Sequence, residues 1–243
     1  MNKAIFITVR TGSTRLPNKS ILKIKDKFTI EYVIGNVKKS KYADMVVLCT
    51  TELKEDQILC SIAEKNGINF YCGSELNKFE RWQEACERFD IDFFVTADGD
   101  DLFYDAGLAD LCFEQIKDND FIDGQGLYND VYGMKSSILK TILDIPTETN
   151  VEPHEIVEFL KNTKLRVKKL TDVPDTYKKK NIRMTLDYED DFKFFSTVIE
   201  NLKLDFSIKN VLNYIDDNPH IRDINYGREI DWKNNQLGGD KHE

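Results

Sequence analysis

In the first hundred residues, two kinds of apolar pattern alternate along the sequence, and this alternation constrains the fold of the chain most. One pattern is a short, nearly continuous apolar run, found at residues 4–9, 45–49, 69–72 and 93–97. The other is helical spacing, clearest at Ile30, Val33, Ile34 and Val37. Continuous apolar runs are typical of strands that are buried on both faces, and spacing by three and four residues predicts one buried helix face. The alternation of strand-like and helix-like segments therefore predicts a parallel sheet covered by helices on both sides.

The second half of the chain is less regular. Helices are predicted over residues 135–143, 152–160 and 190–202, and strands over residues 166–170 and 182–186. Ser207 is a good N-cap for a further helix that ends near Ile215. Because no linker or repeat interrupts the pattern, we expect one domain over residues 1–233, followed by a polar tail at 234–243.

Composition excludes several classes of protein. The formal net charge of −9 argues against nucleic acid as a partner. No apolar run approaches the roughly 20 residues of a membrane span, so we expect no membrane partner. The five cysteines are odd in number, widely spaced and without a CxxC pair, which predicts neither a zinc site nor a disulfide framework. A reducing cytoplasm is the expected location.

Residues 9–19, VRTGSTRLPNK, follow directly on the first apolar run. Three cations lie along this segment, at Arg10, Arg15 and Lys19. Gly12 lets the backbone approach an anion closely, and Ser13 and Thr14 add hydroxyl donors. The segment matches neither the P-loop nor the GxGxxG fingerprint. It is either a basic surface loop or a phosphate-binding loop, and its place after a buried strand favours phosphate.

Carboxylates gather in two further places. TADGDDLFYD ends the fourth apolar run, and we expect Asp100 to be a Mg²⁺ ligand and Asp105 to cap the next helix. RMTLD, residues 183–187, ends in Asp187 at the close of a predicted strand. Two roles stay open for Asp187: a second metal carboxylate, or the N-cap of the helix that begins near Glu189.

Five segments, taken in order, resemble a known family. VRTGSTRLPNK is similar to the ARxGSxRLPGK opening of cytidylyltransferases that make CMP-activated acidic sugars, such as the 3-deoxy-manno-octulosonate enzyme. ADGDDLFYD, GLYNDVY, PHEIVEF and RMTLDYEDDF resemble the TGDCPLID, GLDVEVF, EHVTPYI and RWTVDTPEDF segments of the spore coat polysaccharide biosynthesis protein F group. The resemblance extends from about residue 3 to residue 216. The chain departs from it at Asn18, where the family has Gly, and at Leu102, where the family has Pro.

The resemblance implies a fold and a reaction. The fold is a Rossmann-like nucleotide-diphospho-sugar transferase of the GT-A type, a three-layer α/β sandwich with a mixed, mostly parallel central sheet. The reaction is transfer of a cytidylyl group from CTP to an acceptor oxygen with release of pyrophosphate, assisted by Mg²⁺. The implied nucleotide-binding residues are Val9, Arg10, Thr11, Gly12, Ser13, Thr14, Arg15, Lys19, Gly73, Arg81 and Asp98. The residues expected to act in catalysis are Arg10, Arg15, Lys19 and Asp100, with Asp100 and Asp187 as the metal ligands.

The acceptor is less sharply implied. An acidic or phosphorylated small molecule, such as an acidic sugar for a surface glycan, would be bound by Asp130, His154 and Arg183. An alternative role for Arg81 is an ion pair with Glu80 or Glu84 on its own helix. Relatives often dimerise through an insertion, here about residues 121–170, so a homodimer is expected. Two alternatives remain open: a nucleotidyltransferase that uses another triphosphate or a phosphorylated polyol, and an inactive nucleotide-sugar-binding protein.

Overall fold

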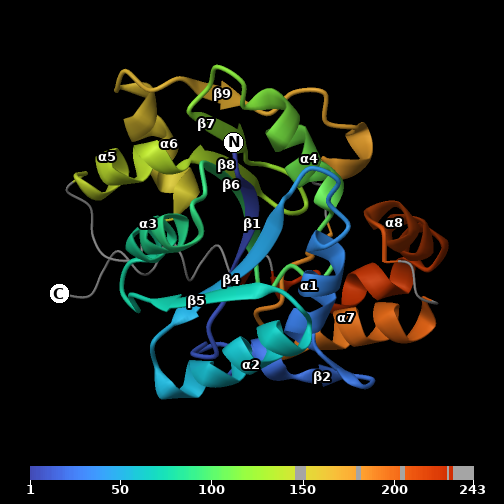
Figure 1. The fold of residues 1–243 in the computed structure, drawn as a ribbon. Coiled ribbons are helices and arrows are strands. Elements are labelled where there is room, and N and C mark those ends of the chain that lie inside the picture. Colours follow the sequence, from blue (N-terminus) through green and yellow to red (C-terminus); the bar gives the residue numbers. More distant parts are fainter. Residues whose placement is uncertain (146–151, 179–181, 203–205, 229, 232–243) are drawn as a thin grey trace.

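The computed structural model describes residues 1–145, 152–178, 182–202, 206–228 and 230–231, so the predicted tail at 234–243 lies outside the described residues. A seven-stranded sheet runs through this part of the chain in the order β5-β4-β1-β6-β8-β7-β9 (Figure 1). The strands are β1 (Lys3–Thr8), β4 (Met45–Thr51), β5 (Asn69–Gly73), β6 (Phe93–Asp98), β7 (Phe121–Gly124), β8 (Val131–Lys135) and β9 (Val167–Lys169). β8 is antiparallel to both its neighbours and the other pairings are parallel. The mixed, mostly parallel sheet is thus confirmed.

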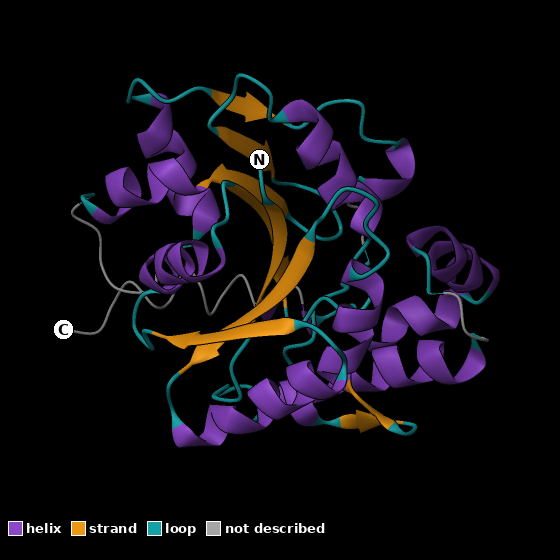
Figure 2. Cartoon of the chain, in the orientation of Figure 1, coloured by secondary structure: helices purple, strands orange, loops and turns teal. Residues whose placement is uncertain are grey.

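Helices cover both faces of the sheet, as Figure 2 shows. One apolar cluster joins the sheet to α1 (Thr29–Val37), α2 (Gln57–Lys65) and α4 (Ala106–Gln115). A second cluster joins the other face to α3 (Lys78–Phe89), α5 (Leu139–Leu143) and α6 (Pro153–Lys161). Alternate side chains of β1 divide between them, since Ile5 and Ile7 belong to the first and Ala4 and Phe6 to the second. The three-layer sandwich follows from this two-sided burial.

The last two long helices pack beside these layers. α7 (Glu189–Asn201) and α8 (Ile208–Asp217) share a third apolar cluster with Tyr32, Leu102 and Phe103. Leu102 is fully buried there, at the position where the related family has Pro. A two-stranded hairpin, which the sequence did not predict, is formed by β2 (Lys23–Ile24) and β3 (Lys27–Phe28). Short 3-10 helices complete the described structure: Lys19–Ile21, Lys54–Asp56, Ser136–Ile138, Asp175–Tyr177 and Pro219–Ile224.

Polar side chains begin several of the helices. Asp105 accepts a hydrogen bond from the backbone N–H of Gly107 and caps α4, and Ser207 caps α8 through the N–H of Asn210. Both caps were predicted from the sequence and are confirmed. Asn77 starts α3 in the same way, by accepting from two backbone N–H groups. Each cap satisfies donors that have no partner inside the helix.

The strand predicted over residues 182–186 is wrong. These residues have no regular secondary structure. The place beside β6 is taken by β8, so this segment is left outside the sheet. One backbone bond ties it to the neighbouring loop, from the N–H of Leu186 to the carbonyl of Asp100 at 3.0 Å.

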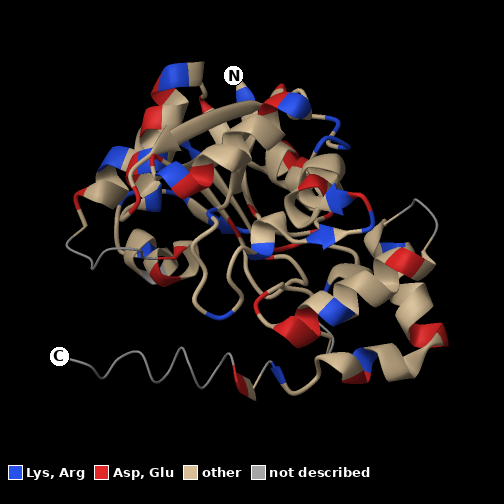
Figure 3. Ribbon diagram, turned by 90° about the horizontal axis from the view of Figure 1, so that it is seen from below, with Lys and Arg blue, Asp and Glu red and all other residues tan. Residues whose placement is uncertain are grey.

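The order of the strands sets the place for a ligand. After β1 the chain forms β4 and then β5 on one side, and returns to the other side of β1 as β6. In open sheets of this kind, ligands bind at the carboxyl ends of the strands where the strand order reverses. The loops after β1 and β6 flank that point. Figure 3, seen from below, shows acidic and basic segments together around the middle of this view. Across the described residues, no helix is both long and apolar enough to cross a membrane.

Candidate active site

Three charged side chains from distant parts of the sequence meet at the carboxyl ends of β1 and β6. The ammonium of Lys19 donates to Asp100 Oδ2 at 2.5 Å and to Asp187 Oδ1 at 2.9 Å. Lys19 comes from the first loop, Asp100 from the loop after β6, and Asp187 from the segment before α7. Lys19 of the first loop is therefore in direct contact with both carboxylates that were predicted as metal ligands.

Asp187 is the most enclosed member of the group, with 2% of the residue exposed. Arg15 donates to Oδ1 at 2.7 Å, and Arg183 donates to Oδ2 at 2.7 Å. Burial alone raises the pKa of Asp187, but Lys19 and Arg15 outweigh it and lower the pKa to about 2. Burial likewise lowers the pKa of Lys19, but Asp100 and Asp187 reverse this and raise the pKa to about 12. Both groups are therefore charged at neutral pH.

A second carboxylate holds this segment in place. Asp191, fully buried, accepts from Arg183 Nε at 3.1 and 3.2 Å and from the backbone N–H groups of Asp187 and Tyr188. Asn225 donates to Asp191 at 2.9 Å. Asp191, and not Asp187, thus supplies the carboxylate that caps the start of α7. Of the two roles left open for Asp187, the N-cap role is the one that the geometry disfavours.

The first loop is anchored by a buried carboxylate that the sequence did not single out. Asp56, with no exposed surface, accepts from the backbone N–H of Thr11 at 2.7 Å and from its hydroxyl at 2.6 Å. Thr51 donates to the other oxygen of Asp56. Asn18 takes the left-handed conformation, with φ of 58°, at the position where the family has Gly. Asn tolerates this conformation better than most residues, which explains the departure.

The ends of β1 and β6 approach each other closely. The N–H of Gly99 donates to the carbonyl of Thr8 at 2.9 Å. A Cβ atom on Gly99 would lie 2.6 Å from the Cβ of Val9 and 3.1 Å from that carbonyl oxygen. Only glycine fits between the two loops. Gly99 therefore brings the Asp98–Asp101 turn against the start of the first loop.

The turn after β6 concentrates negative charge. Asp98, the last residue of β6, is exposed. Partial burial and then the charges of Asp100 and Glu152 raise the pKa of Asp98 to about 7. Asp101 is 5% exposed, and burial followed by the charge of Asp100 raises its pKa well above the ordinary value. Such crowding of carboxylates favours the approach of a cation.

Arg81 is a buried guanidinium in α3, with 4% of the residue exposed. It donates to the carbonyl of Ser74 at 2.7 Å, and its Nε has no hydrogen-bond partner. No ion pair with a carboxylate is formed by Arg81 in the part of the chain that the structure describes, so the predicted pairing with Glu80 or Glu84 is not seen. Burial and then the nearby charge of Arg10 lower the pKa of Arg81. An unpaired buried cation beside a second cation is suited to an anionic ligand.

The residues predicted to bind the acceptor lie in different settings. Arg183 is 6% exposed, and its guanidinium is committed to Asp187 and Asp191. Asp130 accepts from the backbone N–H groups of Gly126 and Leu127, which shapes the loop between β7 and β8. His154 is half-buried in the first turn of α6.

The remaining predicted residues of the nucleotide site are also arranged around the first loop. Gly12 and Thr14 are exposed, and Ser13 accepts from the N–H of Leu16 at 3.3 Å. Gly73 lies at the end of β5, where an added Cβ would meet Tyr71 at 2.8 Å and Glu84 at 2.9 Å. The part of the first loop around Gly12 and Thr14 is therefore open to solvent.

The donor set fits one small, hard cation. Asp100 and Asp187 both contact one nitrogen atom, so their oxygens converge on a single point. Mg²⁺ in phosphate-handling sites takes one or two carboxylates and completes its shell with phosphate oxygens and water. No group of three or more His, Cys, Asp or Glu residues suited to a metal ion occurs among the described residues. The convergent pair therefore fits a metal shared with a substrate better than one held by protein alone.

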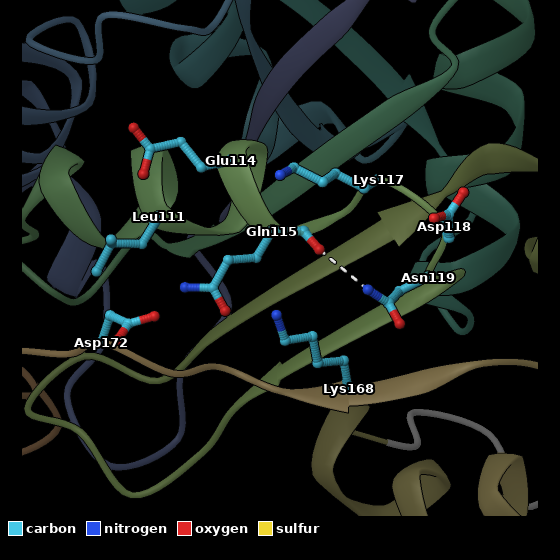
Figure 4. A pocket seen from close by; sticks show the side chains of 8 residues that line it. All are labelled: Leu111, Glu114, Gln115, Lys117, Asp118, Asn119, Lys168 and Asp172. Atoms are coloured by element: carbon cyan, nitrogen blue, oxygen red, sulfur yellow. Dashed lines mark hydrogen bonds between the residues drawn. The ribbon is translucent and has the colours of Figure 1, made fainter.

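A separate hollow is lined by none of these charged groups (Figure 4). It measures about 410 Å³ and is lined by Leu111, Glu114, Gln115, Lys117, Asp118, Asn119, Lys168 and Asp172. Asn119 donates to the carbonyl of Gln115 across it at 3.0 Å. The hollow borders the start of β7, which pairs with the end of β8 beside the amino end of β6. The hollow thus lies at the opposite end of the strands from Lys19, Asp100 and Asp187.

The fold and the site define a nucleotidyltransferase type of α/β protein, with cations and carboxylates facing each other where the strand order reverses. Residues 4–212 match the family model described as "Cytidylyltransferase", and the chain belongs to this family. It is accordingly an enzyme of the nucleotidyltransferase class.

Several known proteins resemble the chain over most of its length. An uncharacterized protein of Methanocaldococcus jannaschii is 29% identical over 225 residues, which cover 90% of this chain and 92% of that protein. The spore coat polysaccharide biosynthesis protein SpsF of Bacillus subtilis is 23% identical over 90% of this chain and 96% of its own length. A solved cytidylyltransferase of Leptospira borgpetersenii has a TM-score of 0.80 and 26% identity, and covers 91% of this chain and 97% of its own.

More distant structures share the fold. A CMP:2-keto-3-deoxy-manno-octonic acid synthetase, solved in complex with CTP, has a TM-score of 0.63 and 13% identity, over 82% of this chain and 99% of its own. The Rossmann-like sandwich expected from the sequence is confirmed by these likenesses.

The sequence did not predict the buried residues that position the charged segments of the site. Asp56, Asp191 and Asn225 are all buried and bond to the segments that carry the charged groups. One signal was available for Asp191, which follows Asp187 by four residues and lies in the first turn of a helix. Asn225 lies 34 residues further on, and nothing in its neighbourhood marks it.

Proposed function

We propose that this enzyme transfers the cytidylyl group of CTP to an oxygen of an acidic sugar or related surface-glycan precursor, and releases pyrophosphate. Mg²⁺ is the proposed cofactor. The observation that carries the proposal is the contact of Lys19 with Asp100 and Asp187, with Arg15 bonded to the same oxygen of Asp187. In this proposal, cations that bind the triphosphate would face carboxylates that bind the metal.

The chain's own residues would act mainly by position and charge, which is how most phosphoryl-transfer sites work. Arg10, Arg15 and Lys19 would hold the β- and γ-phosphates and neutralise the charge that develops on the leaving pyrophosphate. Asp100 and Asp187 would hold Mg²⁺, which when bound polarises the phosphorus centre under attack. No protein nucleophile is required, because the acceptor oxygen attacks directly.

Arg183 would serve as a positioning residue. Its bonds to Asp187 and Asp191 fix the carboxylate of Asp187 in the orientation that faces Lys19. Since both of these carboxylates are buried, a free acceptor would have to displace an enclosed ion pair to reach Arg183. We therefore keep the acceptor role predicted from the resemblance for Asp130 and His154, and not for Arg183.

The nucleotide side of the proposal rests on Arg81 and the segment at Gly73. Arg81 is a buried cation that forms no ion pair with a carboxylate among the described residues, and its pKa is lowered by burial and by the charge of Arg10, which suits the negative charge of a bound nucleotide. Asp98 is exposed at the end of β6, where its carboxylate would accept a hydrogen bond from an amino group or a hydroxyl of the nucleotide. The proposal names CTP and not another triphosphate because the chain belongs to the cytidylyltransferase family and because residues 9–19 resemble the opening segment of such enzymes.

Assembly and location belong to the same proposal. A homodimer would form through the insertion at about 121–170, of which residues 146–151 lie outside the described part. Phe159 in α6, 45% exposed, supplies apolar surface for such a contact. A cytoplasmic location fits five cysteines that form no framework of bonds.

Nucleotide selectivity is the first test. Isothermal titration of the purified protein with CTP, ATP, GTP and UTP in the presence of Mg²⁺ should show preferred binding of CTP. Preferred binding of another triphosphate would instead favour the alternative nucleotidyltransferase. A panel of acidic sugars, phosphorylated polyols and neutral sugars, followed by pyrophosphate release, then identifies the acceptor.

The variant Asp100→Asn separates an enzyme from an inactive binding protein. It should abolish pyrophosphate release from any acceptor that the wild type uses, while circular dichroism and thermal unfolding stay close to those of the wild type. Asp118→Asn, an exposed carboxylate in the hollow of Figure 4, is the matched control. Full activity of Asp100→Asn would refute the proposed metal site, and CTP binding without turnover of the whole panel would favour the binding protein.

A further inference from the structure

Two cysteines from different elements lie side by side. The Sγ atoms of Cys60 in α2 and Cys72 in β5 are 2.9 Å apart. A disulfide has an S–S distance of about 2.05 Å, so the sulfurs need to approach by less than about 1 Å. Both residues are free thiols, and the other three cysteines are buried. No sequence pattern pairs these two cysteines, since eleven residues separate them and the chain has an odd number of cysteines, five.

The two thiols differ in access. Cys72 is half-buried, whereas only 6% of Cys60 is exposed. Burial, and then the contact with Cys72, raise the pKa of the Cys60 thiol to about 12. A small oxidant in solution therefore meets Cys72 first, with Cys60 behind it. An accessible thiol backed by a resolving thiol is the arrangement of reversible redox sites.

Each cysteine belongs to an element that holds the candidate active site. Cys60 lies one turn beyond Asp56, the carboxylate that anchors Thr11 of the first loop. Cys72 directly precedes Gly73 and Ser74, and the carbonyl of Ser74 accepts from Arg81. Packing around Gly73 is tight, since an added Cβ would meet three side chains within 3.2 Å. A shift of β5 against α2 is therefore passed to Arg81 and to the first loop.

We propose that Cys60 and Cys72 form a reversible redox-modification site whose oxidation weakens nucleotide binding. The oxidant is a low-molecular-weight disulfide such as oxidised glutathione. The Cys72 thiolate attacks one sulfur of the oxidant, which forms a mixed disulfide and releases one thiol. The Cys60 thiolate then attacks the Cys72 sulfur and releases the second thiol. Two protein thiols are oxidised, one small disulfide is reduced to two thiols, and the protons pass to those thiols.

The effect on binding rests on the proposed function, but the formation of the bond does not. Native protein is incubated with oxidised glutathione, and intact mass, peptide mapping and thiol titration follow the product. Wild type should lose the mass of two hydrogen atoms and two titratable thiols, with Cys60 linked to Cys72. Cys60→Ser should instead retain one glutathione on Cys72. Cys72→Ser should remain unmodified, and Cys112→Ser, a lone buried thiol in α4, should behave like the wild type.

Binding of CTP is then titrated before oxidation, after oxidation and after reduction. Oxidation should weaken CTP binding about tenfold, a usual size for coupling between two sites, and reduction should restore it. Absence of the Cys60–Cys72 bond in native protein, or a glutathione adduct on Cys72→Ser, overturns the modification site. Equal CTP affinity in both redox forms overturns its effect on binding. If neither the reduced nor the oxidised protein binds CTP, the proposed function is refuted. The mass measurement alone then decides whether Cys60 and Cys72 form a disulfide.

Discussion

The ammonium of Lys19 lies 2.9 Å from Asp187 Oδ1 and holds together two segments that are 168 residues apart in the sequence. Asp100 contacts the same nitrogen at 2.5 Å. Lys19 thus bridges the two carboxylates proposed as metal ligands and offsets one of their two negative charges. A cation that binds between them competes with Lys19, and a released Lys19 becomes available to the triphosphate. This exchange of partners leads to two predictions.

The first prediction concerns the phosphates that Lys19 binds. Lys19→Met keeps most of the side-chain length and removes the charge. We expect CTP affinity to fall about 10- to 100-fold, the range of one lost charge-assisted hydrogen bond. Affinity for CMP should change by less than about threefold, because CMP lacks the β- and γ-phosphates. Calorimetric titration with both nucleotides checks this, and equal losses for the two would argue against contact with the outer phosphates.

The second prediction concerns the metal itself. Mn²⁺ stands in for Mg²⁺ and is followed by the electron paramagnetic resonance signal of the free ion, in the absence of nucleotide. Lys19→Met should bind Mn²⁺ about tenfold more tightly than the wild type, because the competing ammonium is gone. The double variant Lys19→Met, Asp187→Asn should lose that gain. Identical Mn²⁺ binding by wild type and Lys19→Met would mean that the lysine does not compete with metal.

The third prediction concerns the close approach of the two loops. Gly99→Ala places a methyl group 2.6 Å from the Cβ of Val9, so the ends of β1 and β6 must separate. We expect a loss of about 1 to 3 kcal/mol in the free energy of unfolding, as for overpacked cores. Gly12→Ala is the matched control, since nothing lies within 4 Å of its added Cβ. Urea unfolding of both variants tests this, and equal stabilities would show that the loops yield easily.

Much of the parallel half of the fold was predictable from the sequence. Buried strands and one-sided helices leave clear periodic patterns, as at β1, α1 and β4, because each pattern depends only on local neighbours. The antiparallel strands β7 and β8 were not predicted. Each is only four or five residues long, and their pairing depends on long-range contacts.

The candidate site was predictable in its charged groups but not in their support. Arg15, Lys19 and Asp100 follow strand ends, where chemistry in such sheets is expected. The strand predicted before Asp187 was wrong, because its apolar residues pack with α7 and α8 and not in the sheet. Asp56 resembled an ordinary helix start. Its role depends on Thr11, which is 45 residues earlier, and no local pattern records that contact.

The fourth prediction concerns acid stability. The pKa of Asp187 is lowered from 3.8 to about 2 in the folded protein, so folding favours its charged form. The resulting stability is fully present above the unfolded pKa, at neutral pH, and is lost as the pH falls towards the folded pKa. In full it amounts to about 2 kcal/mol, of which about 1 kcal/mol is lost by about pH 3.

Asp187→Asn removes this contribution. The variant should be less stable than the wild type near neutral pH, because three cations lose their charged partner: Arg15, Lys19 and Arg183. Its unfolding free energy should nevertheless fall less steeply than that of the wild type on acidification. Urea unfolding at about pH 6 and about pH 3 measures the difference, which should be about 1 kcal/mol smaller for the variant than for the wild type. The exposed control Asp118→Asn should follow the wild type. The same slope in wild type and Asp187→Asn would show that the buried ion pairs do not lower the pKa of this carboxylate.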